Sequence, residues 1–194
     1  MRYLSFDLEA TGLKENDYII EFAMIPFDTE TMTFEEKLSK EFVVKCPSFE
    51  SLKPNLDKWV IDNNKKLIER AHEKGISLTN FKENLKNYFE SKEVKSYFGN
   101  KKIILFGKSM NSIDLPFLSR DLGFEFIRTY FHHRVLDLTS VSLGLIDFKM
   151  LPPECESGSV LMRHLGYGEV AHTALADSKN TAKMYFKLIE MLKK

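Results

Sequence analysis

The sequence predicts an α/β protein built on a mixed five-stranded sheet, in which three antiparallel strands come first and helices flank the sheet. Three apolar segments joined by short connections occupy the first 45 residues, and two segments with helical periodicity follow between residues 55 and 89. A wholly apolar segment at residues 103–107 then begins an alternation of strand and helix patterns. Short connections favour antiparallel pairing, because parallel strands need a long crossover. Strands followed by strand–helix alternation indicate a mixed sheet covered by helices.

Five segments carry strand patterns bounded by turn signals or charged residues. We expect strands at residues 2–8, 18–27, 38–45, 103–107 and 135–138. The first is followed by the turn signal of Thr11 and Gly12, and the wholly apolar fourth is expected to be central and buried on both faces. Glu21 falls within the second strand, where we interpret it as a cross-strand or solvent-facing partner and exclude it from the site.

The first helices are predicted where apolar residues recur at intervals of three or four. One such stretch runs from residue 55 and ends at Gly75. Another covers residues 78–89, with Ser77 or Thr79 as candidate N-caps. Both have the apolar stripe of helices that pack on a core.

Two further helices are expected in the second half of the chain. One begins near Asp114, with Pro116 in its first turn and Gly123 as its C-terminal cap. The last is the amphipathic C-terminal segment from Leu175 onwards. Between them, residues 149–159 are rich in proline and glycine and are expected to form a loop.

The composition is that of an ordinary globular protein, and we expect a single domain over residues 1–194. Hydrophobic residues make up 43% and charged residues 29% of the chain, and the formal net charge is zero. A nucleic-acid partner would therefore have to be held by local groups rather than by the field of the whole molecule. Cys46 and Cys155 are expected to be reduced thiols. With no signal-peptide pattern and no apolar run of about 20 residues, we expect a soluble cytoplasmic protein.

Two carboxylates lie near the end of the first predicted strand. Side chains alternate between the two faces of a strand, so Asp7 and Glu9 project from the same face. Beside apolar neighbours these acids repel each other and resist burial as anions. A divalent cation between them is the usual solution. An acidic strand end exposed to water is the alternative, and Asp-x-Glu alone does not decide between the two.

Asp114 lies at or just before the start of the helix that follows the central strand. One interpretation is a helix cap. The other is a third carboxylate at the edge of the sheet where ligands of α/β proteins bind. The local sequence leaves both open.

A histidine and an aspartate mark the start of the C-terminal helix. Asp177 lies in its early turns, and His172 precedes Asp177 by five positions. Five steps of about 100° do not share a helical face, so His172 is expected in the preceding loop, leaning over the same site. Its ordinary pKa near 6.5 would let it accept a proton at neutral pH.

Together these positions resemble the three motifs of the DEDD exonucleases, in the subgroup whose third motif is His-x4-Asp. The residues that carry the resemblance are Asp7, Glu9, Thr11, Gly12, Asn111, Asp114, His172 and Asp177. Their order and spacing agree over nearly the whole chain, which makes the set far more specific than any one motif.

The resemblance implies a ribonuclease H-like fold and a two-metal 3′→5′ exonuclease. It implies that Asp7, Glu9, Asp114 and Asp177 hold two Mg²⁺ or Mn²⁺ ions, with Asp7 shared, and that His172 is the general base. Carboxylate oxygens suit such hard cations, and two ions can stabilise both the attacking and the leaving oxygen of a displacement at phosphorus.

The substrate is less sharply indicated. Leu13, Trp59 and Arg134 match substrate contacts of oligoribonuclease, and the match implies further contacts at Thr11 and Asn111. His133 stands where that enzyme has a tyrosine that reaches the partner subunit, so stacking across a homodimer is left open. Residues 161–181 are more similar to the proofreading subunits of bacterial DNA polymerases.

From the match to oligoribonuclease we expect short RNA as the leading substrate. The similarity to proofreading subunits places the 3′ ends of single-stranded DNA second. A non-catalytic nucleic-acid-binding protein on the same fold is a further alternative. It would predict eroded metal ligands, whereas the four carboxylates and the histidine are all present.

Overall fold

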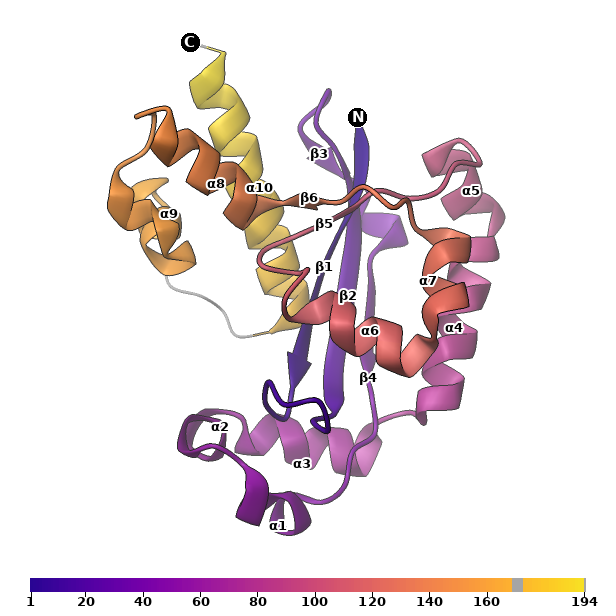
Figure 1. Cartoon of the computed structure of the whole chain (residues 1–194). Coiled ribbons are helices and arrows are strands. Elements are labelled where there is room, and N and C mark those ends of the chain that lie inside the picture. Colours follow the sequence, from indigo (N-terminus) through magenta and orange to yellow (C-terminus); the bar gives the residue numbers. More distant parts are fainter. Residues whose placement is uncertain (169–172, 194) are drawn as a thin grey trace.

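The protein consists of a mixed β-sheet with helices on both faces (Figure 1). The computed structural model describes residues 1–168 and 173–193. The strands are β1 (Arg2–Ala10), β2 (Ile19–Asp28), β3 (Thr33–Phe34), β4 (Lys40–Val43), β5 (Leu105–Gly107) and β6 (Leu136–Asp137). Their order is β3-β2-β1-β5-β6, and β4 also pairs with β2. The α/β class, the mixed sheet and the flanking helices are confirmed.

Strand pairing follows the prediction, with one addition. β1 is antiparallel to β2 and parallel to β5, and β4 is antiparallel to β2. The expected strands all appear among the described residues, and the two-residue strand β3 brings the sheet to six strands instead of five. β1 also continues past residue 8 to Ala10, so that Glu9 lies within the strand and directly opposite Glu21 of β2.

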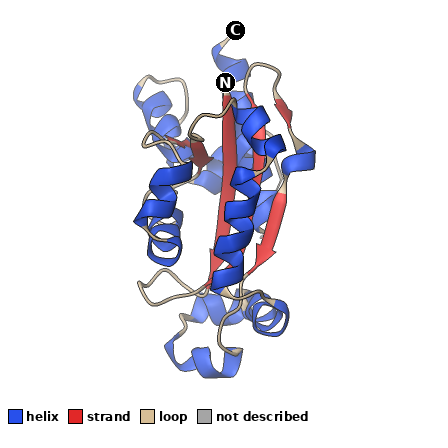
Figure 2. Ribbon diagram, turned by 90° about the vertical axis from the view of Figure 1, so that its right-hand side faces the viewer, coloured by secondary structure: helices blue, strands red, loops and turns tan. Residues whose placement is uncertain are grey.

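The helices lie on both faces of the sheet and at one end of it (Figures 1 and 2). They are α1 (Phe49–Leu52), α2 (Lys58–Asn63), α3 (Lys65–Lys74), α4 (Leu78–Glu90), α5 (Lys92–Phe98), α6 (Asp114–Leu122), α7 (Phe124–Tyr130), α8 (Leu138–Asp147), α9 (Gly158–His164) and α10 (Ala174–Leu192). No helix among the described residues has the length and apolar character needed to cross a bilayer.

The alternation of side chains along β1 divides the core in two. Leu4, Phe6 and Leu8 point to one face and pack with side chains of α4, α6 and α7. Tyr3 points to the other face and packs in a cluster contributed by α8, α9 and α10. On this second face the Ser5 hydroxyl donates to the carbonyl oxygen of Ser178 in α10, with an O···O distance of 2.7 Å. Since Asp7 and Glu9 share the parity of Ser5, they lie under α10.

Several helix boundaries follow from identifiable caps. The Ser77 hydroxyl accepts a hydrogen bond from the backbone N–H of Asn80, which confirms Ser77 as the N-cap of α4. Gly123 ends α6 as predicted. The predicted stretch from residue 55 is divided at Asn64 into α2 and α3.

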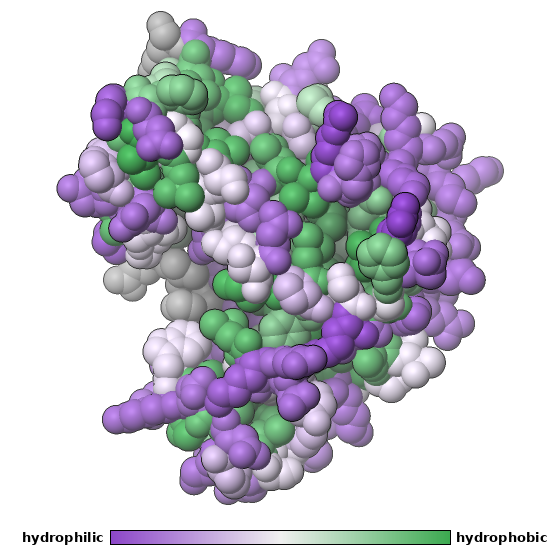
Figure 3. Space-filling model, in the orientation of Figure 1, coloured by the Kyte–Doolittle hydropathy of each residue, from purple (hydrophilic) through white to green (hydrophobic). Residues whose placement is uncertain are grey.

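The prediction of a loop at residues 149–159 was only partly right. A 3-10 turn occupies Pro153–Glu156, and α9 begins at Gly158. The proline pair follows the end of α8, where it does not obstruct a helix that starts five residues later. On the face seen in Figure 3, apolar side chains gather near the end of α8, where Leu143, Phe148 and Met150 are exposed.

Candidate active site

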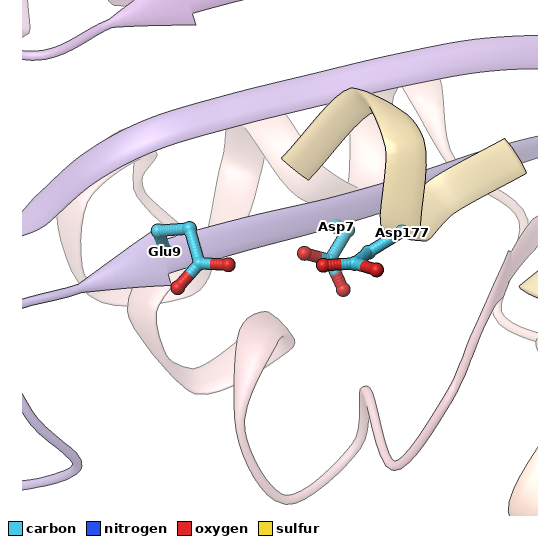
Figure 4. A group of neighbouring side chains, drawn as sticks. All are labelled: Asp7, Glu9 and Asp177. Atoms are coloured by element: carbon cyan, nitrogen blue, oxygen red, sulfur yellow. The ribbon is translucent and has the colours of Figure 1, made fainter. Parts of the chain in front are cut away.

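Three carboxylates from two elements converge on the α10 side of β1. Asp7 and Glu9 project from the strand, and Asp177 projects from the first turns of α10, which passes over it (Figure 4). One oxygen from each residue lies within 4.8 Å of those of the other two. The side chains are partly buried, so the exposed acidic strand end considered above is not what the fold forms.

Asp114 brings a fourth carboxylate to the same strand. It is 6% exposed and is the first residue of α6, whose N-cap position is occupied by Ile113. The backbone N–H of Leu8 donates to Asp114 Oδ1, with an N···O distance of 3.3 Å. Because Leu8 lies between Asp7 and Glu9, this bond brings Asp114 to the same strand as these two acids. It therefore favours a role for Asp114 as a further carboxylate of the site over a role as a helix cap.

The crowding of these acids changes their proton affinity. Burial raises the pKa of Asp7 well above its usual value, and the charges of Asp114, Glu9 and Asp177 raise it further. Burial, followed by the charges of Asp177 and Glu21, raises the pKa of Glu9 to about 7. Burial also raises the pKa of Asp114 to about 7, although the hydrogen bond from Leu8 opposes the rise. Such shifts are typical of a site whose negative charge is not fully balanced by the described residues.

Lys108 supplies positive charge to this side of the sheet. It follows β5 directly, and its charge lowers the pKa of Asp7, Glu9 and Asp114 without cancelling the rise. The lysine side chain packs against Gly158 at the start of α9, where a Cβ atom would lie 2.9 Å from its Cδ atom. Glycine at this position therefore leaves room for the lysine.

The donor set fits divalent cations. Asp7, Glu9 and Asp177 offer carboxylate oxygens at close range, with Asp114 bonded to the same strand. Hard cations such as Mg²⁺ and Mn²⁺ prefer oxygen ligands of this kind. A bound cation would compensate the charge that otherwise raises the pKa of these groups.

The loop that carries Asn111 and leads to Asp114 is held by Asp137 of β6. The Asp137 carboxylate accepts hydrogen bonds from the backbone N–H groups of Ser109 and Met110, at 3.2 and 2.9 Å. It also caps α8 by accepting from Thr139. Asn111 itself is exposed beside α6.

Leu13 and Trp59 are placed where a ligand could reach them. Leu13 is 73% exposed and lines a cleft of about 280 Å³ with Ser112, Phe117 and Arg120. Trp59 is 58% exposed on α2, at the end of the molecule toward which β1 runs (Figure 1). Apolar and aromatic side chains left exposed in this way are suited to stacking on bases.

The resemblance implies that Thr11 contacts the substrate, whereas in the structure its side chain is buried and bonded within its own loop. It is 1% exposed, and its hydroxyl donates to Asp17 Oδ1 at 2.9 Å and accepts from the backbone N–H of Tyr18 at 2.9 Å. Gly12 approaches the same aspartate so closely that a Cβ atom would lie 2.4 Å from Asp17 Oδ2. Thr11 and Gly12 therefore shape the loop that presents Leu13.

His133 and Arg134 are not brought to the carboxylates of their own chain. Both are exposed and precede β6, whose pairing with β5 begins at Leu136 opposite Phe106, and Phe106 pairs with Ser5. Because β1, β5 and β6 are parallel, residues before Leu136 lie toward the start of β1. Asp7 and Glu9 lie toward its end.

His172 falls outside the described residues, so its predicted place beside the carboxylates stays a prediction. Glu21, which the sequence analysis excludes from the site, is 1% exposed and lies opposite Glu9, so it does not face solvent. The cross-strand alternative stated for it is the correct one. Lys108 was not predicted as a site residue. Its position directly after a buried strand was the sequence signal that could have indicated it.

The fold and the site define a class of α/β proteins that gather carboxylates on a central strand of a mixed sheet. The RNase_T exonuclease family matches residues 4–185, and the chain belongs to it. No curated protein sequence matches the chain.

Solved structures agree with this assignment at the level of fold, which is ribonuclease H-like. The structure of E. coli exonuclease I with single-stranded DNA superposes with a TM-score of 0.74 at 17% identity, covering 100% of this chain and 41% of that one. Cell-death related nuclease 4 gives 0.71 at 17% identity, covering 98% and 64%. The nuclease domain of 3′hExo, a DEDDh family member bound to rAMP, gives 0.65 at 15% identity, covering 97% and 92%. The chain thus spans less than two thirds of the first two structures.

Proposed function

We propose that the protein is a 3′→5′ exonuclease that hydrolyses single-stranded nucleic acid and releases nucleoside 5′-monophosphates. The observation that carries the proposal is the meeting of Asp7, Glu9 and Asp177 within 4.8 Å, in a chain that belongs to an exonuclease family. The raised pKa of Asp7 and Glu9 supports a site that binds cations.

We propose that two Mg²⁺ or Mn²⁺ ions are held by Asp7, Glu9, Asp114 and Asp177, with Asp7 shared between them. When bound, such ions supply an activated water and stabilise the charge on the attacking and leaving oxygens. The protein's own part is to fix the carboxylates: β1 holds two, and the Leu8 N–H restrains a third.

We propose that His172 accepts the proton of the attacking water. An imidazole with an ordinary pKa near 6.5 is largely neutral at pH 7 to 8 and can take up a proton there. Leu13 and Trp59 would stack on the terminal bases, since both side chains are exposed. Asn111, exposed beside Asp114, would contact the backbone of the substrate.

Short oligoribonucleotides are the proposed leading substrate. The 3′ ends of single-stranded DNA are the alternative substrate. The neighbours include a nuclease bound to rAMP and exonuclease I bound to a dA16 oligonucleotide, so the fold accommodates both chemistries. His133 and Arg134 lie away from the carboxylates of their own chain. They could contribute to a site only from the second subunit of a homodimer, which is the arrangement implied by the resemblance to oligoribonuclease.

The test compares three 5′-labelled substrates: a diribonucleotide, a longer RNA and a single-stranded DNA, each with Mg²⁺, Mn²⁺ or EDTA. Fast cleavage of the diribonucleotide is the expected result. Ladders on DNA with an untouched dinucleotide would move the protein to proofreading or repair. Absence of metal-dependent cleavage of all three would favour a non-catalytic nucleic-acid-binding protein.

A further inference from the structure

Glu21 is a buried carboxylate that the proposed chemistry does not use. It lies on β2 directly opposite Glu9, so that the two side chains share one face of the sheet. It is 1% exposed and therefore has little access to water. A buried carboxylate needs hydrogen-bond donors or a countercharge, and both are present.

The two oxygens of Glu21 bind two different helices. The backbone N–H of Ala174, the first residue of α10, donates to Oε2 with an N···O distance of 3.2 Å. Arg70 Nη1 of α3 donates to Oε1, also at 3.2 Å. Arg70 is itself held by Glu41 of β4, at 3.1 Å. Both oxygens of Glu21 thus have protein partners.

The contact with Ala174 fixes the start of the helix that carries Asp177. The first N–H groups of a helix have no partner within it, and Thr173 makes no side-chain capping bond. Ala174 is fully buried, so its N–H depends on Glu21. The N–H of Asp177 then donates to the carbonyl oxygen of Thr173 at 2.9 Å, which completes the first turn. A carboxylate at this position also interacts favourably with the helix dipole.

We propose that Glu21 is a positioning residue: by capping α10 from a neighbouring strand it holds Asp177 at the distance from Asp7 and Glu9 that binding of divalent cations requires. This inference rests on the proposed function of the carboxylates as a metal site. Arg70 partly offsets the charge of Glu21, which repels the carboxylate of Glu9 across the strand pair.

The test measures Mn²⁺ binding by calorimetry, together with kcat, KM and thermal stability. Glu21→Ala should weaken Mn²⁺ binding at least tenfold and lower kcat with little change in KM. Glu21→Gln keeps an acceptor for the Ala174 N–H and should recover most of the loss. The matched control is Glu36→Gln, which removes the 2.8 Å ion pair with Lys179 farther along α10 and should change Mn²⁺ binding less than twofold.

A folded Glu21→Ala variant that binds Mn²⁺ like the wild type would overturn the inference, as would an equal loss in Glu36→Gln. If Glu21→Ala does not fold, Arg70→Met decides, because the Arg70 side chain is half-exposed. It should weaken Mn²⁺ binding about threefold, and unchanged binding would again overturn the inference. Failure of the proposed function looks different, since the wild type itself would then neither bind Mn²⁺ nor cleave any substrate.

Discussion

Two acidic regions of one sheet differ in what surrounds them. Asp137, at the end of β6, is 6% exposed and accepts backbone hydrogen bonds from Ser109, Met110 and Thr139, at distances of 2.9 to 3.2 Å. Asp7, at the end of β1, is surrounded instead by other carboxylates, and its pKa is raised by burial and by their charge. Of these two acids, Asp137 is the one whose oxygens accept hydrogen bonds within the described part of the chain.

This difference separates a structural acid from a functional one. Backbone N–H donors satisfy the oxygens of Asp137, so the fold itself completes the Asp137 site. Within the described residues only the charge of Lys108 lowers the pKa of the β1 carboxylates, so we propose that protons at low pH and cations at higher pH neutralise them. Burial of an acid is therefore weak evidence of function, and the identity of its neighbours is strong evidence.

Removing a carboxylate from the β1 site should have the largest effect on activity. Asp7→Ala should lower the rate of hydrolysis about a thousandfold or more, because it removes a ligand expected to be shared by two ions worth several kcal/mol of transition-state stabilisation. The free energy of unfolding should stay the same or rise, since repulsion among acids is relieved. Initial rates and urea unfolding measure both quantities. Normal activity in this variant would refute the assigned site.

His172→Ala tests the proton acceptor proposed for the same site. The rate at neutral pH should fall by roughly 10²–10⁴, the usual contribution of a general base. Mn²⁺ affinity should remain near that of the wild type, because His172 is not proposed as a ligand. An unchanged rate would remove the histidine from the mechanism.

The opposite behaviour is expected at Asp137. Asp137→Ala should lower the free energy of unfolding by about 2–4 kcal/mol, because it removes a helix cap and leaves the buried N–H of Met110 and the part-buried N–H of Ser109 without an acceptor. Asp147→Ala, an exposed acid at the end of α8, is the control and should change stability by less than about 0.5 kcal/mol. Urea unfolding of both variants measures the two free energies of unfolding. Equal stability of the two variants would show that Asp137 is not the structural acid described above.

The affinity for Mg²⁺ or Mn²⁺ should rise with pH. The pKa values of Glu9 and Asp114 are about 7, so protons compete with the cation below that pH. Binding at pH 6 should be roughly a hundredfold weaker than at pH 8, about tenfold for each of the two carboxyl groups. Titration calorimetry at the two pH values measures the ratio, and a pH-independent affinity would contradict the assignment of these acids as ligands.

The smallest effect concerns the metal-free protein. Glu9 and Asp114 have a pKa of about 7 when folded and near 4 when unfolded, so the folded chain binds more protons between these values. With respect to these groups the free energy of unfolding should therefore be highest below about pH 4, and it should fall as pH rises from there through 7. Urea unfolding in EDTA checks this, and Glu9→Gln should flatten the trend. A steeper trend in Glu9→Gln would reverse the assigned sign.

The sequence predicted much of this site because its signals are local. Alternation along one strand placed Asp7 and Glu9 on one face, and helical periodicity placed Asp177 early in α10. What local patterns could not show was register between strands. Glu21 could be recognised as buried and opposite Glu9 only once the pairing of β1 with β2 was known.

For the remaining residues, the tertiary structure was needed to tell whether they belong to the site. Asp114 was equally consistent with a helix cap until its bond to the Leu8 N–H was seen. Arg134 had a plausible phosphate-binding role, but the parallel order of β1, β5 and β6 puts it toward the other end of the sheet. The short strand β3 and the helix α9 have too few residues to establish a period, so their absence from the prediction follows from length.

The most direct test of the central claim is calorimetric titration of the metal-free protein with Mn²⁺ at pH 7.5, comparing wild type, Asp7→Asn and Asp137→Ala at a temperature where all three are folded. We predict binding to the wild type and to Asp137→Ala, and loss of binding in Asp7→Asn. Equal binding by Asp7→Asn and wild type would contradict the claim that the β1 carboxylates are completed by a cation.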